Sequence, residues 1–155
     1  MASESVWSYP RPPAVRPSER LVEVVLGGEV IARTTAAIQV LETSHPPTWY
    51  LPSADFAPGA LMPGEGASFC EWKGTARYFD LLGGGRVSRG AAWYYPHPAS
   101  GFEQLSGRVA VYAGRVDECR VDGIPVLPQP GGFYGGWITP EVVGPFKGGP
   151  ETRGW

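Results

Sequence analysis

Two short segments of the chain combine the residue types that proton transfer and group transfer require. In the first, Glu42, Ser44 and His45 stand just before Pro46 and Pro47, which hold the following backbone extended. A histidine titrates near neutral pH and serves as a general acid or base, and a carboxylate such as Glu42 can orient it. The same residues also suit a polar strand end closed by turn-type hydrogen bonds, so both interpretations stay open.

The second segment, residues 69–78, brings together a thiol and a cation. Cys70 and Lys73 flank Trp72, and Lys73 is one of only two lysines in a chain that otherwise uses arginine. A partly desolvated lysine acts as a nucleophile or binds anions. If the segment is one extended strand, Lys73 lies on the face opposite Cys70 and Trp72. The alternative is a surface ion pair between Glu71 and Lys73 beside a core tryptophan.

Aromatic residues and glycines supply the walls that a small-molecule site needs. They gather in two runs, residues 93–98 and 133–137, and the second run contains Gly135 and Gly136. Aromatic rings stack on planar ligands, and glycine lets the backbone approach a ligand closely. Packing in the core of the protein is the alternative role for these rings. The candidate wall residues are Trp72, Trp93, Tyr95, Phe133, Tyr134 and Trp137.

The composition indicates which kind of fold positions these segments. The 155 residues include 22 glycines and 17 prolines, about twice the usual share. Both residue types are unfavourable inside helices and suit turns. Hydrophobic residues make up 43% of the chain and charged residues 18%, a balance that is too apolar and too weakly charged for a disordered protein. The sequence therefore predicts an all-β fold, a single compact domain of antiparallel hairpins with one or two very short helices.

Three segments have the pattern of a strand, a tight turn and a returning strand. Their turns fall at Gly27-Gly28, at residues 83–85 and at Asp122-Gly123, and such residues adopt the positive φ angles of two-residue hairpin turns. The three segments are either a weak internal repeat or three ordinary hairpins. Further strands are expected over residues 37–42, 48–51, 91–95 and 108–112, with a short helical turn over 101–105 and a helix start at Thr139.

The predicted β domain spans residues 20–147. Residues 1–19 contain four prolines and are expected to form an extended arm, anchored by Trp7 and Tyr9 if it packs. Residues 148–155 are expected to form a loose tail.

Charge and motif content argue against several function classes. The net charge of −2 and the lack of a Lys/Arg cluster give no electrostatic footprint for nucleic acid. No apolar run is long enough for a membrane span, and the first residues lack the pattern of a secretory signal. We therefore expect a cytoplasmic protein in which Cys70 and Cys119 are not bonded to each other. Their spacing predicts no metal site, and no cofactor or oligomeric state is indicated.

Four runs of the sequence resemble a known family of bacterial and fungal proteins. The runs are residues 40–52, 69–78, 91–98 and 130–139, within a resemblance that extends from about Val6 to Lys147. The family is called domain of unknown function four-two-seven and is also catalogued as nucleotidyltransferase-like. The resemblance implies a β-tent-like fold or a small barrel or sandwich. Many tent domains hold zinc through paired CxxC motifs, which this sequence lacks, and the metal-carboxylate signature of nucleotidyltransferases is also missing.

Together these segments predict a site for a small molecule. Its polar groups are expected to come from Glu42, Ser44, His45, Cys70 and Lys73. If the site is catalytic, group transfer fits best, with Lys73 as nucleophile or anion binder and His45 as a proton carrier held by Glu42. The alternatives are a non-catalytic module in which the aromatics cage a ligand, cationic ligands included, and a structural or interaction domain without a pocket. We therefore predict that His45 and Lys73 line one concave site with at least two of the aromatic residues.

Overall fold

Strands dominate the computed structural model, which describes residues 3–152 and residue 155. Each helical segment among these residues is a single 3-10 turn of three residues, so the all-β prediction is confirmed. The strands are β1 (Glu4–Ser5), β2 (Ala14–Pro17), β3 (Val22–Leu26), β4 (Glu29–Thr34), β5 (Ile38–Leu41), β6 (Thr48–Pro52), β7 (Leu61–Cys70), β8 (Gly74–Gly83), β9 (Arg86–Tyr94), β10 (Arg108–Val111), β11 (Glu118–Val121), β12 (Ile124–Pro125), β13 (Leu127–Pro128), β14 (Trp137–Ile138) and β15 (Val142–Val143). The 3-10 turns are η1 (Val6–Ser8), η2 (Ser53–Asp55), η3 (Glu103–Leu105), η4 (Ala113–Arg115) and η5 (Pro150–Thr152).

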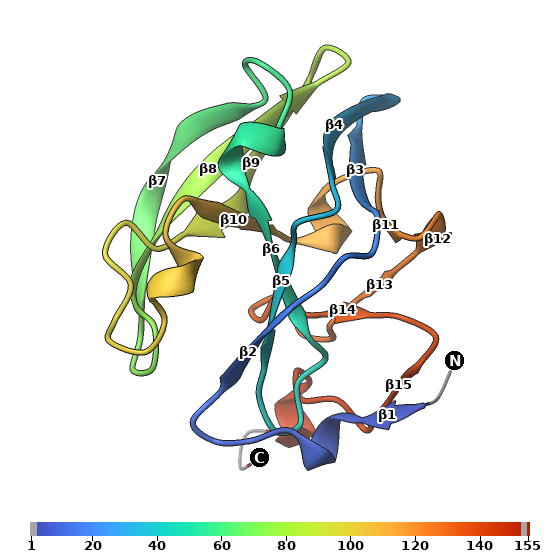
Figure 1. Cartoon of the computed structure of the whole chain (residues 1–155). Helices are drawn as coiled ribbons and strands as arrows, with labels where there is room; N and C mark the ends of the chain where they lie inside the picture. Colours follow the sequence, from blue (N-terminus) through green and yellow to red (C-terminus); the bar gives the residue numbers. More distant parts are fainter. Residues whose placement is uncertain (1–2, 153–154) are drawn as a thin grey trace.

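Two sheets form the body of the domain (Figure 1). The larger has seven antiparallel strands in the order β2-β5-β6-β10-β9-β8-β7, and the smaller has four in the order β12-β11-β3-β4. The remaining strands of the described residues form two short pairs, the antiparallel pair of β13 with β14 and the parallel pair of β1 with β15. The large sheet stays open between its edge strands β2 and β7, so the barrel alternative does not apply.

The main hydrophobic core lies between the two sheets. The small sheet contributes Val22, Val24 and Val121, and the large sheet contributes Trp49 and Leu81, all at most 1% exposed. Because side chains alternate across a strand, the neighbours of these large-sheet residues point to the opposite face. That opposite face carries a second apolar cluster, which becomes the floor of the candidate site described below.

The three predicted hairpins are formed, each with a two-residue turn. The turn residues Gly27-Gly28, Gly84-Gly85 and Asp122-Gly123 all have positive φ, as such turns require. The first two turns also touch one another. A Cβ on Gly84 would lie 1.9 Å from the carbonyl oxygen of Gly27. Glycine at this contact lets the tip of the β8–β9 hairpin pack against the β3–β4 hairpin and join the two sheets.

Residues 69–78 do not form one extended strand. Strand β7 ends at Cys70, β8 begins at Gly74, and Cys70 pairs with Gly74 across a tight turn. Gly74 has a φ of +108°, a conformation that L residues rarely adopt, and this reverses the chain. The face assignment that holds for an extended strand therefore does not apply, and Cys70, Trp72 and Lys73 all line the same cavity.

The helix start expected at Thr139 is also wrong. The chain turns there and continues into β15, which pairs with β1 from the other end of the sequence. Local capping signals favoured a helix, but Gly144 and Pro145 leave no room for one and the pairing with Glu4–Ser5 prevails.

The N-terminal and C-terminal segments that the structure describes pack against the domain, in the lower part of Figure 1. In the N-terminal arm, Val6 and Tyr9 are buried and β2 pairs with β5. Trp7 contacts the ring of Trp155 edge to face, with ring centroids 5.2 Å apart. In the C-terminal segment the Thr152 side chain is buried and its hydroxyl accepts a hydrogen bond from the Gly148 N–H.

Cys70 and Cys119 are both free, which confirms that they do not form a disulfide. No helix among the described residues has the length and apolar character needed to cross a membrane.

Candidate functional site

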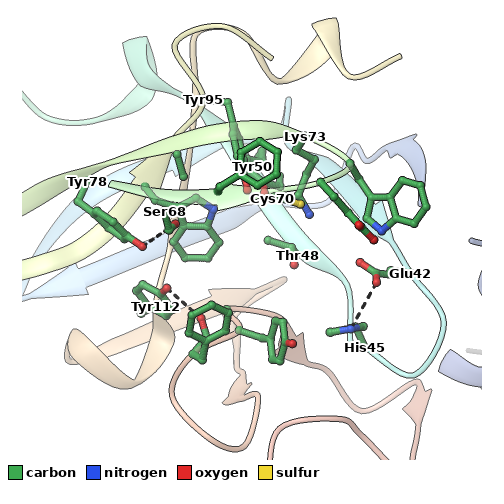
Figure 2. Close-up of a pocket in the computed structure, with 18 of the residues that line it drawn as sticks. Glu42, His45, Thr48, Tyr50, Ser68, Cys70, Lys73, Tyr78, Tyr95 and Tyr112 are labelled. Atoms are coloured by element: carbon green, nitrogen blue, oxygen red, sulfur yellow. Dashed lines mark hydrogen bonds and ion pairs between the residues drawn. The ribbon is translucent and has the colours of Figure 1, made fainter. Parts of the chain in front are cut away.

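A cavity of about 340 Å³ opens on the face of the large sheet that points away from the small sheet (Figure 2). This volume lies within the range of small-molecule sites, which runs from roughly 300 to 1,000 Å³. Strands β6, β7, β8 and β9 supply its floor, and segments around residues 42–45, 71–73, 112, 133–135 and 147 close its sides.

The floor follows from the alternation of side chains along each strand. Thr48 and Tyr50 on β6, two residues apart, both face the cavity, and the same spacing recurs on β7, on β8 and at the end of β9. Across the sheet, Trp93 stands opposite Tyr78. The floor residues that follow this pattern are Thr48, Tyr50, Ser68, Cys70, Ala76, Tyr78, Trp93 and Tyr95.

A tight turn between β5 and β6 carries Glu42 and His45 over the cavity. The His45 N–H donates to the Glu42 carbonyl oxygen at 3.0 Å, which closes the turn. Ser44 inside this turn has a φ of +69°, an uncommon conformation for a residue with a Cβ. Its carbonyl oxygen accepts a hydrogen bond from the Lys147 N–H at 2.8 Å, so the turn is tied to the C-terminal segment.

A buried glutamine fixes the orientation of the His45 ring. The Gln129 Oε1 accepts the Gly136 N–H at 3.0 Å, so its amide nitrogen must point the other way. That nitrogen donates to the Lys147 carbonyl oxygen at 2.7 Å and lies 3.0 Å from His45 Nδ1. Nδ1 is therefore the acceptor, and the proton of the neutral imidazole sits on Nε2, on the side of Glu42.

His45 is a neutral ring near physiological pH. Burial, together with the positive charges of Lys147 and Lys73, lowers the pKa of His45 from 6.5 to about 4. Its Nε2 lies 3.6 Å from Glu42 Oε2, which is beyond hydrogen-bond distance. His45 thus presents an N–H donor at Nε2, and its sequence-based role as a proton carrier stays a prediction.

The loop between β13 and β14 forms the opposite wall. Phe133, Tyr134 and Gly135 line the cavity. The rings of Tyr134 and His45 pack edge to face, with their centroids 4.7 Å apart. A Cβ on Gly135 would lie 2.0 Å from Cη2 of Trp93. Glycine at this position lets the loop backbone pack directly on the indole of Trp93. The sequence had suggested that Gly135 would let the backbone approach a ligand instead.

Two lysines reach the cavity from different segments. Lys147 Nζ donates to the main-chain oxygen of Trp155 at 3.0 Å and lies 5.5 Å from the centre of the Tyr134 ring. Lys73, in the turn after β7, has no hydrogen bond or ion pair from its Nζ within the described part of the chain. Lys73 is therefore the cation available to a ligand.

The structure brings together all the predicted site residues except Ser44 and Trp137. His45 and Lys73 line one cavity with several of the predicted aromatics, as expected. Ser44 is completely buried behind the cavity, where its hydroxyl has no hydrogen-bond partner among the described residues. Trp137 is a core residue that stacks on Trp49 and donates its indole N–H to the Val111 carbonyl oxygen at 2.9 Å. The predicted residues at the cavity are Glu42, His45, Cys70, Trp72, Lys73, Trp93, Tyr95, Phe133 and Tyr134.

Sequence reasoning missed several lining residues and Gln129. Lys147 carried a signal, because it is the second of only two lysines. Tyr50 and Tyr78 follow from strand alternation once the facing side of each strand is known. Gln129 carries no local signal, since two of its three side-chain partners, His45 and Lys147, lie 84 and 18 residues away along the chain. The missed lining residues are Thr48, Tyr50, Ser68, Phe69, Glu71, Ala76, Tyr78, Tyr112, Gly135 and Lys147.

Within residues 3–152 and residue 155, no group of three or more histidine, cysteine, aspartate or glutamate side chains gathers as a metal site would require.

The fold and site define an all-β domain with an aromatic-walled cavity on one sheet face. The chain belongs to the family described as domain of unknown function DUF427, whose catalogue name is nucleotidyltransferase-like, and the match covers residues 14–122. This confirms the family resemblance. The cavity residues Phe133, Tyr134 and Lys147 lie outside the matched range. A comparison with curated proteins finds no match.

Proposed function

We propose that this domain binds a small molecule that contains a planar ring, in the cavity on the large sheet. The observation that carries the proposal is the gathering of aromatic side chains from strands and loops around one open volume. A planar ring that enters between them gains stacking and edge contacts on several sides. The aromatic residues at the cavity include Tyr50, Trp72, Tyr78, Trp93, Tyr95, Tyr112, Phe133 and Tyr134.

The exposure of these rings supports binding. Phe133 at the cavity is 69% exposed, and Trp72, Tyr112 and Tyr134 are partly exposed. Apolar surface left in contact with water is unfavourable by about 25 cal/mol per Å². A ligand that covers these rings therefore gains hydrophobic free energy, in addition to any hydrogen bonds it makes.

The contacts within the cavity favour binding over catalysis. An enzyme of the predicted kind needs His45, Lys73 or Cys70 within hydrogen-bond reach of one another, and no hydrogen bond joins them. Burial also raises the pKa of the Tyr50 and Tyr95 hydroxyls, so both stay protonated near neutral pH and neither is a base.

Group transfer is the second candidate function. The observation that favours it is that Lys73 and Cys70, two nucleophile types, face the same cavity as Glu42. Transfer through either residue would leave a covalent adduct on the protein for part of the cycle. Intact-protein mass spectrometry with nucleoside triphosphates tests this candidate. An added mass that disappears in Lys73→Met or Cys70→Ser supports it, and an unchanged mass under all conditions contradicts it.

Titration with indole and phenol, followed by two-dimensional amide NMR, tests ring binding. We expect saturable shifts at Trp93, Tyr95 and Tyr134. Ala76 lies in the cavity floor, so Ala76→Leu should fill the space and abolish these shifts. Ala54→Leu, the same change at an exposed position, should bind like the wild type.

Two results would contradict ring binding. One is the absence of saturable shifts at the cavity. The other is unchanged binding in a folded Ala76→Leu protein, as judged by its amide spectrum. Tyr134→Ala provides a second variant if Ala76→Leu does not fold, because Tyr134 lies in a loop and its removal opens the wall.

A further inference from the structure

The two sides of the cavity differ in how completely their polar groups are hydrogen-bonded. On one side the Tyr78 hydroxyl donates to Ser68 Oγ at 2.9 Å, and the Tyr112 hydroxyl donates to the Phe133 carbonyl oxygen at 3.0 Å. These groups satisfy one another. Glu42, His45, Thr48 and Lys73 lie away from them in Figure 2 and form the polar end of the cavity.

The polar end holds unused hydrogen-bonding capacity. Among the described residues, the side chains of Glu42, Thr48 and Lys73 make no hydrogen bond, and His45 is bonded only through Nδ1. The nearest partners of the Glu42 carboxylate are His45 Nε2 at 3.6 Å and Arg11 Nε at 3.9 Å. Glu42, Thr48 and Lys73 are partly exposed, so water can occupy these positions until a ligand replaces it. Polar groups that converge on a mostly aromatic cavity and are not bonded to one another indicate where a ligand forms its hydrogen bonds.

Three of the four groups at the polar end have a single hydrogen-bonding role, whereas the Thr48 hydroxyl can both donate and accept. An ionised Glu42 carboxylate can only accept, and the Lys73 ammonium can only donate. His45 presents Nε2–H because Gln129 already occupies Nδ1. The donor on His45 and the acceptor on Glu42 lie 3.6 Å apart and therefore act as one pair.

We propose that the ligand is a planar ring whose edge carries an amide N–H and a carbonyl oxygen on the same side, as in a lactam or an aromatic primary carboxamide. The N–H donates to Glu42, and the carbonyl oxygen accepts from His45, with Lys73 as a further donor. This assignment rests on the proposed binding of a ring in the cavity. Peptide bonds are excluded as the edge, because a trans amide points its N–H and C=O to opposite sides.

Ligands with only donors or only acceptors fit this pair poorly. A carboxylate that accepts from His45 comes within a few ångströms of the Glu42 carboxylate and is repelled by it. An amidinium that donates to Glu42 faces the N–H of His45 and the charge of Lys73. A neutral edge with both functions avoids both conflicts.

A matched set of benzene and pyridine derivatives tests the assignment, with dissociation constants measured by amide NMR at pH 7. Benzamide carries both functions, benzoate only acceptors and benzamidine only donors. 2-Pyridone presents the lactam edge, and N-methyl-2-pyridone lacks its donor. We expect benzamide or 2-pyridone to bind roughly tenfold more tightly than the other three, as one hydrogen bond to a charged group provides. Tighter binding of benzamide indicates a carboxamide ligand, and tighter binding of 2-pyridone indicates a lactam.

Glu42→Gln converts the acceptor into a side chain that also donates. We expect this variant to lose affinity for benzamide and gain affinity for benzoate, so that benzoate becomes the tighter-binding of the two. Glu29→Gln, the same change at an exposed hairpin position, should keep the wild-type order.

The outcomes separate the two proposals. Equal binding of all five probes overturns the amide assignment and leaves ring binding in place. An unchanged probe order in Glu42→Gln also overturns the assignment. Binding of none of the probes, together with none of indole or phenol, overturns both proposals.

Discussion

The burial of His45 predicts a loss of stability in mild acid that one substitution should remove. The folded protein holds the pKa of His45 at about 4, whereas the unfolded chain has the ordinary value of 6.5. Above about pH 6.5 the ring is neutral in both states, and its contribution to stability is fully present. As the pH falls toward 4, His45 binds a proton in the unfolded chain but stays neutral in the folded protein, so folding becomes less favourable.

The size of the effect follows from the two pKa values. The interval from 6.5 to 4, at about 1.4 kcal/mol per pH unit, corresponds to roughly 3 kcal/mol of unfolding free energy. That is a large part of the 5 to 15 kcal/mol typical of a whole domain. The side chain of His45 is only 10% exposed, so solvent screening reduces this figure little.

Urea unfolding between pH 7 and 4.5 measures the effect. His45→Asn supplies an oxygen that can accept from Gln129 but does not titrate, so its stability should fall less steeply with pH than that of the wild type. Carboxylates with lowered pKa values, such as Glu4 and Asp122, act in both proteins and cancel in the difference. His97→Asn, which removes the other, exposed histidine, is the matched control and should keep the wild-type slope. Parallel curves for wild type and His45→Asn would refute the reasoning.

Two further predictions concern the cavity walls. Gly135→Ala places a Cβ 2.0 Å from Cη2 of Trp93, so we expect a loss of roughly 1–3 kcal/mol in unfolding free energy and altered Trp93 fluorescence. A stability within 0.5 kcal/mol of wild type, on the scale of ordinary surface changes, would contradict this contact. Gln129→Leu removes the donor at His45 Nδ1, so long-range imidazole ¹⁵N spectra should show only the Nε2–H tautomer in wild type and both tautomers in the variant. A single, unchanged tautomer in Gln129→Leu would mean that Gln129 does not select it.

The hairpins were predictable because their signals are local. Gly27-Gly28 and Asp122-Gly123 specify turns through their own φ angles, whatever surrounds them. The turn at residues 71–73 has no such pair and depends on Gly74 alone, so the sequence did not indicate it. The pairing of β15 with β1 joins opposite ends of the chain and overrides the local helix signal at Thr139.

The candidate site was predictable only in part. The segments around His45 and Lys73 stood out because they combine scarce polar residue types, and the fold brings them to one cavity. The run 133–137 shows the limit of such reasoning. Tyr134 faces the cavity, whereas Trp137 enters the core, because the chain between them passes close to Pro46 at Gly136. Long-range packing of this kind leaves no mark on the local sequence.

A crystal structure of the protein soaked with benzamide tests the central claim most directly. The account predicts the benzene ring among Trp93, Tyr95 and Tyr134, with the amide nitrogen at Glu42 and the amide oxygen at His45 Nε2, each within hydrogen-bond distance. Benzamide bound elsewhere on the protein, with this cavity filled only by solvent, would contradict the account.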